Sequence, residues 1–131
     1  MTLRTIRQIT FLVTIFAVTT PALAGSDDYA FQPVRAEVMK GKEVTVAVRL
    51  IQKGTNKSIP DAVIIASRID MAPDGMAAMD APLSPVPGSE PGVYAFNTNL
   101  MMAGRWRLSL AAKVQGEAET VKSEVIFTAK P

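Results

Sequence analysis

The chain contains neither cysteine nor histidine. Without cysteine it has no disulfide framework, no thiolate chemistry and no cysteine for lipid attachment. Without histidine, Ser-His-Asp and Cys-His nucleophile systems are excluded, as is every imidazole-based zinc or copper site. The phosphate loop, the dinucleotide-binding G-x-G-x-x-G and the G-x-S-x-G nucleophile motif are also missing. These absences predict that the protein is not an enzyme.

The first residues have the order of a secretory signal. Arg4 and Arg7 precede an apolar stretch, and residues 21–24 (PALA) end it with a small-x-small pattern. This order predicts a signal peptide over residues 1–24 and one mature domain over residues 25–131, exported to the periplasm.

The alternative is an uncleaved membrane anchor, because residues 8–24 carry no charge. That run is at the lower limit for crossing a bilayer, and Pro21 interrupts it, so we expect cleavage and no stable membrane insertion. Without Arg4 and Arg7, the 14 lysines and arginines fall to 12 and equal the 12 aspartates and glutamates. A neutral mature domain gives no support to a nucleic-acid partner.

Alternating hydrophobicity predicts β-strands through most of the mature chain. Residues 43–52 show it most clearly, with branched aliphatic side chains at every second position. Residues 62–71 are apolar on both sides at their start, which suggests a central strand with two neighbours, and Val63, Ile65, Ile69 and Met71 share one expected core face. Further strands are expected over residues 31–38, 92–102 and 105–114, with a last one whose inner face carries Val121, Val125 and Phe127.

These strands, six or seven in number and separated by turn signals, predict an all-β fold. The expected class is an immunoglobulin-like antiparallel β-sandwich. Residues 73–91 hold five prolines and two glycines, so no long helix or strand is expected there. Asp74 is suited to cap a single helical turn over residues 75–80, which would put Met76 and Met79 on one face.

Five of the seven methionines fall between residues 70 and 102. A thioether is a soft, neutral ligand that favours Cu(I) and Ag(I) over zinc, magnesium or calcium. Three thioethers can give Cu(I) trigonal coordination without adding any charge of their own. The candidate metal ligands are Met71, Met76, Met79, Met101 and Met102.

The alternative is that methionine fills gaps in the core. Met71 and Met102 continue the apolar faces of their strands, so they are expected to point inward. Met76 and Met79 lie in a segment with little core to fill and are the strongest ligand candidates. For Met101 the sequence favours neither the ligand nor the core position. Trp106 could cap a bound Cu(I) ion, but its inward phase favours a core tryptophan.

A calcium site made of Asp70, Asp74 and Asp80 ranks last. Their spacing lacks the every-second-residue ligand pattern of an EF-hand loop.

Three short motifs carry a resemblance to a known family. Residues 68–79 bear methionines, residues 91–94 (PGVY) begin a strand with Gly-x-Tyr, and residues 102–106 (MAGRW) form a methionine-Gly-x-Trp corner. In these motifs the chain resembles the YtkA-like / FixH-like family over roughly residues 37–129. The resemblance implies a small β-sandwich facing the periplasm or cell exterior. Carried over by position, it also implies Met71, Met76, Met79 and Met102 as candidates.

Some members of that family are accessories to copper handling or occur with heavy-metal efflux adaptors, and others are tied to cytochrome oxidase assembly. The chain differs from the FixH-type members in that it lacks a convincing membrane anchor. This difference weakens the hypothesis of a role in oxidase assembly. We therefore hypothesise a periplasmic Cu(I)- or Ag(I)-binding protein that delivers metal to an envelope efflux adaptor or oxidase-assembly protein. The alternative is a metal-independent interaction module that docks such a partner through its Pro/Met loop.

Overall fold

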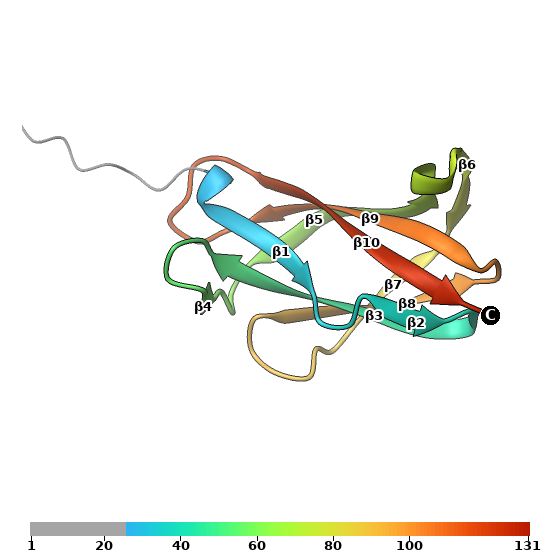
Figure 1. Cartoon of the computed structure of the whole chain (residues 1–131). Helices are drawn as coiled ribbons and strands as arrows, with labels where there is room; N and C mark the ends of the chain where they lie inside the picture. The colour runs from blue at the N-terminus through green and yellow to red at the C-terminus, as the bar shows by residue number, and fades with distance from the viewer. Residues whose placement is uncertain (1–25) are drawn as a thin grey trace, which may run out of the picture.

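A computed structural model describes residues 26–131 of the chain, which form two β-sheets packed face to face (Figure 1). The first sheet has the strand order β1-β3-β8-β7, with β4 beside β3; the second has the order β2-β10-β9-β5-β6. The first consists of β1 (Tyr29–Pro33), β3 (Gly41–Gln52), β4 (Lys57–Ser58), β7 (Leu83–Val86) and β8 (Val93–Leu100). The second consists of β2 (Glu37–Met39), β5 (Val63–Met71), β6 (Met76–Ala81), β9 (Gly104–Lys113) and β10 (Val121–Lys130).

The predicted all-β sandwich is confirmed. Two short 3-10 turns, η1 (Ser26–Asp28) and η2 (Ala72–Asp74), complete the described elements. All strand pairs are antiparallel except β2 with β10, which is parallel. The expected signal peptide lies outside the described residues. Within residues 26–131, no helix is long and apolar enough to cross a membrane.

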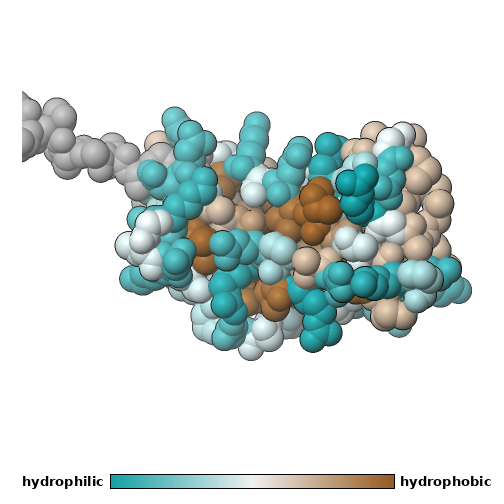
Figure 2. All heavy atoms as spheres, in the orientation of Figure 1, coloured by the Kyte–Doolittle hydropathy of each residue, from teal (hydrophilic) through white to brown (hydrophobic). Residues whose placement is uncertain are grey.

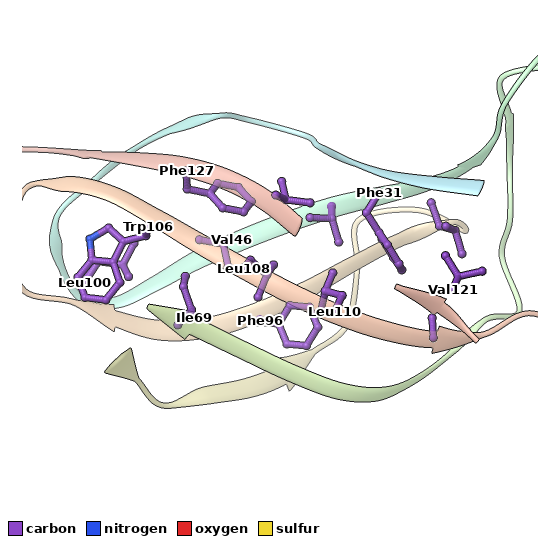
Figure 3. Packing of buried hydrophobic residues seen from close by; sticks show 14 of the residues in the cluster. Phe31, Val46, Ile69, Phe96, Leu100, Trp106, Leu108, Leu110, Val121 and Phe127 are labelled. Atoms are coloured by element: carbon purple, nitrogen blue, oxygen red, sulfur yellow. The ribbon is translucent and has the colours of Figure 1, made fainter. Parts of the chain in front are cut away.

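The core lies between the two sheets and follows the predicted periodicity (Figure 3). In β3, Val46, Val48 and Leu50 are fully buried, and β9 buries Trp106 and Leu108 against them. Burying an aliphatic or aromatic side chain of this size stabilises the fold by about 1.5–3 kcal/mol. In β10 the predicted inner residues Val121, Val125 and Phe127 are all buried.

The strand expected over residues 31–38 is instead two strands in different sheets. β1 ends at Pro33 and β2 begins at Glu37. Proline has no backbone N–H to continue a ladder, so the chain leaves the first sheet there. The backbone N–H of Val34 still donates to Ala47 of β3, whereas the carbonyl of Ala36 already accepts from Thr128 of β10.

The core face predicted for β5 is wrong over the first half of the strand. Ile69 and Met71 are fully buried, but Val63 and Ile65 are 62% and 53% exposed. The pairing of β5 with β9 shifts register between Ile64 and Ala66. A bulge adds one residue and reverses the alternation that follows, so one periodic count cannot cover the whole strand.

The helical turn expected over residues 75–80 is also wrong, because Met76–Ala81 forms β6. The only helical turn nearby is η2, which ends at Gly75 in a left-handed conformation (φ 75°). A second strand, β7, forms inside the segment expected to be irregular. It lies at the edge of the first sheet, the position in which a strand tolerates a proline such as Pro85.

Candidate metal centre

The hairpin of β5 and β6 holds three of the five candidate methionines. Met71 and Met76 are direct partners across it, and such partners project to the same face. The register shifts between this pair and the next one, Asp70 with Asp80, so that residues 77–79 of β6 have no partner on β5. Met79 lies in this unpaired stretch, and Ala81 beyond it packs against the core.

The turn between β8 and β9 carries the other two, Met101 and Met102, and a charged clamp fastens it to the hairpin. The backbone N–H of Arg105 donates to one carboxylate oxygen of Asp74 at 2.8 Å, and its Nε donates to the other at 2.9 Å. Its Nη2 also donates to the carbonyl of Pro73 at 2.7 Å. The clamp therefore joins η2 to the start of β9.

The backbone N–H of Arg105 is the first cause of a lowered pKa at Asp74, and the guanidinium of Arg105 adds to it. The carboxylate is thus held in the charged form that the clamp needs.

Gly104 permits this close approach. It has φ +141°, and a Cβ atom there would lie 2.5 Å from Oδ2 of Asp74 and 2.7 Å from Cε of Met71. A Cβ atom there would displace the ends of these two side chains, and the residue that carried it would be strained at this φ.

We call the end of the sandwich formed by η2, β6 and residues 101–104 the methionine end. It lies on the right in Figure 1, where β6 stands above the turn between β8 and β9. Figure 2 shows moderately hydrophobic, pale brown atoms gathered over this end. The sequences of β6 (MAAMDA) and of residues 101–104 (MMAG) supply this kind of surface.

The five methionines differ in exposure. Met71 is fully buried, which confirms its expected core position, and Met76 is half-buried against the core. Met79, Met101 and Met102 are 41%, 55% and 39% exposed. The inward position expected for Met102 is wrong, because β8 ends at Leu100 and the chain turns before the next inward position.

Trp106 is a core residue, as its phase predicted. It is buried, and its indole N–H donates to the carbonyl oxygen of Met102 at 3.1 Å, which ties the turn to the core.

The three aspartates of this region are all paired with arginines. Asp70 accepts from Nε of Arg68 and Nη2 of Arg107, both at 3.1 Å, and Asp80 lies 3.4 Å from Nη1 of Arg68. Asp74 is held by the clamp described above. Among the described residues, no group of three or more carboxylates gathers to hold a metal ion. The donors left at this end are thioethers, which fit a soft monovalent ion and not calcium.

Asp70 is the one fully buried carboxylate in the described part of the chain. Burial alone would raise its pKa, but the backbone N–H of Ala72 and the guanidinium groups of Arg68 and Arg107 together hold the pKa below its usual value of 3.8. The charged form is thus favoured and fixes the exit of β5 into η2.

The arginine partners were not found from the sequence. Arg105 and Arg107 are visible as outward residues of one strand, and the aspartates are visible in the loop, but nothing in their spacing pairs them. The signal available in the sequence was opposite charge, since one segment carries Asp70 and Asp74 and the other carries Arg105 and Arg107.

The solved structures that resemble the chain include the two described next. The ZirS C-terminal domain gives a TM-score of 0.42 at 9% identity, over 99% of this chain and 86% of that one. The Lin-41 filamin domain gives a TM-score of 0.40 at 14% identity, over 79% of this chain and 94% of that one. No curated protein matches the chain.

A family model described as YtkA-like matches residues 23–111, which include the β5–β6 hairpin, the clamp and the turn before β9. The chain belongs to the YtkA-like family.

Proposed function

We propose that this chain is a soft-metal-binding protein of the cell envelope that holds Cu(I) or Ag(I) through thioethers at the methionine end. Membership of the YtkA-like family fits a small exported domain. The observation that supports a metal site is the Asp74–Arg105 clamp, because it brings the methionines of two distant segments to one end of the sandwich.

Met76, Met79 and Met102 are the proposed ligands. They come from both sides of the clamp and are at least partly accessible to solvent. Met101 is the most exposed of the group and is proposed to exchange with Met102 as the metal enters or leaves. Met71 is proposed to support Met76 from the core side, since the two are cross-strand partners.

Delivery to a partner suits such a site. Neutral thioethers near the surface bind a soft ion without strong electrostatic retention, so a partner with more ligands can take it over. The proposed recipients are an envelope efflux adaptor or an oxidase-assembly protein.

The test is a Cu(I) titration against a competing chromophoric chelator. Met76→Leu/Met79→Leu keeps side-chain volume and removes two thioethers, and we expect it to weaken Cu(I) binding at least about tenfold, or about 1.4 kcal/mol. Met39→Leu is the matched control, because Met39 is exposed on β2 at the opposite edge of the second sheet. Equal affinity in the double variant and the wild type would remove both residues from the site.

The exposure of Met79, Met101 and Met102 also favours the second candidate, a docking surface that works without metal. The two functions separate in a pull-down from envelope extracts with and without copper. Copper-independent capture that survives Met76→Leu/Met79→Leu argues against metal transfer.

A further inference from the structure

The chain changes sheets between β1 and β2, and this crossing opens a groove beside β3. β1 pairs with β3 as far as Val48, the partner of Pro33, and the chain then enters β2 in the second sheet. Within residues 26–131, the first half of β3 therefore has β8 on one side and no strand on the other. The groove between β2 and this half of β3 has a volume of about 700 Å³.

The groove is lined by four basic side chains and one acidic side chain. Arg35, Lys40, Lys42 and Lys130 carry the positive charges, and Glu37 carries the negative charge. Glu37 is already engaged, because its carboxylate lies 3.2 Å from Nζ of Lys130. Among the described residues, the other three cations have no ion-pair partner, and all three are exposed. The groove therefore holds unpaired positive charge that an anionic ligand can neutralise.

Glu43, which follows Lys42, is kept out of the groove. A bulge shifts the pairing of β3 with β8 between Gly41 and Val44, and Glu43 adopts a left-handed backbone conformation within it (φ 54°). Its backbone N–H donates to Oδ1 of Asn99 at 3.2 Å, and Glu43 lines a separate hollow that Asn99 also lines. A left-handed conformation costs a residue other than glycine about 1–2 kcal/mol. The bulge thus leaves the charge of Lys42 uncompensated.

The floor of the groove is apolar. Val38 and Val44 line it from opposite sheets and are half-buried against the core. A ligand that satisfies both the cations and the floor must carry anionic and apolar groups. An extended peptide does so when acidic and apolar residues alternate, because successive side chains point to opposite sides and the long basic side chains reach outward. A bilayer surface is flat, so it would contact the exposed cations but not the floor.

One end of the groove adjoins the methionine end. Gly41, a residue of the groove, pairs with Leu100, which directly precedes Met101. The end of β10 and the start of β9 also meet there, through the pair of Ala129 with Gly104. Figure 1 shows the ends of β2 and β10 next to the turn between β8 and β9. A protein bound in the groove therefore lies beside residues 101–104.

We propose that this groove docks an acidic, extended segment of a partner protein, and that this partner takes the metal from the methionine end. The docking requires no metal, whereas the assignment of the partner as metal acceptor rests on the proposed function. Arg35, Lys40 and Lys42 contact the carboxylates of the partner. Opposite charge speeds the encounter and selects the partner, and its effect weakens as the salt concentration rises.

A titration of the metal-free protein with a blocked peptide of alternating glutamate and valine tests the docking. We expect calorimetry at low salt to give a dissociation constant of about 100 µM or tighter, which Lys40→Glu/Lys42→Glu weakens at least about tenfold. Lys113→Glu/Lys122→Glu is the matched control. It makes the same change in net charge at two exposed positions, at the end of β9 and near the start of β10, away from the groove. It should leave the constant within about twofold.

NMR of the 15N-labelled protein tests the position of the peptide. We expect the backbone amide signals of Val38 and Val44 to shift on titration, and near-UV circular dichroism of both double variants verifies the fold. Equal loss of affinity in the two variants, or no binding at about 1 mM peptide, would overturn the proposal. Binding to phosphatidylglycerol vesicles through Lys40 and Lys42, with no amide shift from the peptide, would overturn it in favour of a membrane surface. Because no metal is present, these outcomes are independent of Cu(I) binding.

Discussion

The two halves of β5 differ in almost every physical respect, although they are parts of one strand. The second half, from Ile69 to Met71, lies between β9 and β6 and is fully buried. The first half, from Val63 to Arg68, has a neighbour on one side alone and is mostly exposed. The difference shows that position in the sheet, and not hydrophobicity, decides burial here, because the first half is the more apolar of the two.

The largest effect is expected from Asp70→Ala in the buried half. The change leaves the guanidinium groups of Arg68 and Arg107 and the backbone N–H of Ala72 without their common acceptor. The loss of these three hydrogen bonds costs about 3 kcal/mol in the free energy of unfolding, because the side chains of Arg68 and Arg107 are 54% and 30% exposed and water partly replaces the carboxylate. Urea unfolding measures it. Asp80→Ala removes the exposed carboxylate that pairs with Arg68 and should cost less than about 1 kcal/mol. Equal losses in the two variants would contradict the structural role of Asp70.

Truncating one isoleucine in each half tests the comparison directly. Ile69→Ala removes a fully buried side chain and should cost about 2–5 kcal/mol. Ile65→Ala removes a side chain that is mostly in water and should cost less than about 1 kcal/mol. The measurement is urea unfolding of both variants. A larger loss at Ile65 than at Ile69 would reverse the comparison.

Gly104→Ala tests how tightly the buried half is joined to the turn. The added Cβ would meet the Asp74 carboxylate and the Met71 methyl group, and the residue would keep an unfavourable φ. Crowding and backbone strain together should cost about 2–3 kcal/mol. Gly41→Ala is the control, because Gly41 has a similar φ and no neighbour within 4 Å. If the two variants lose the same stability, the close approach at Gly104 has no energetic weight.

A smaller effect is expected from pH. Asp70 and Asp74 have pKa values lowered from 3.8, so their contribution to stability is fully present above that value and declines as pH falls through the lower folded-state pKa. The stability difference between wild type and Asp70→Asn should therefore be largest near neutral pH and shrink below about pH 4. Urea unfolding across this range measures it, and a difference that grows on acidification would contradict the sign.

The regular strands were predictable from the sequence, because their side chains alternate between core and solvent with a period of two residues. β9 and β10 alternate without interruption, and their predicted inner residues are buried. In β3, Val46, Val48 and Leu50 are buried as predicted, but the register shifts between Gly41 and Val44, and Ile51 is buried beside Leu50. This period predicted the wrong core face in β5, where the register shifts between Ile64 and Ala66. It also predicted one strand over residues 31–38, where the chain changes sheets after Pro33. Both are events of strand pairing, which local sequence does not record.

The candidate site was predictable in composition but not in arrangement. The methionine cluster and the glycine corner were visible, whereas the ion pair that joins them links residues 31 positions apart. β6 was missed because the prolines and glycines of residues 73–91 predicted an irregular segment and Asp74 a capped helical turn, whereas pairing with β5 makes residues 76–81 a strand. The burial of Asp70 was missed for a similar reason, since its partner Arg107 comes from another strand.

The most direct test of a metal site at the methionine end is the response of each methionine methyl group to Ag(I), a redox-stable soft ion. We expect NMR of the 13C-methyl-labelled protein to show the signals of Met76, Met79 and Met102 shifting together and reaching their end point at one equivalent, with Met39 unchanged. Shifts confined to Met39, or none at all at one equivalent, would contradict the proposed site.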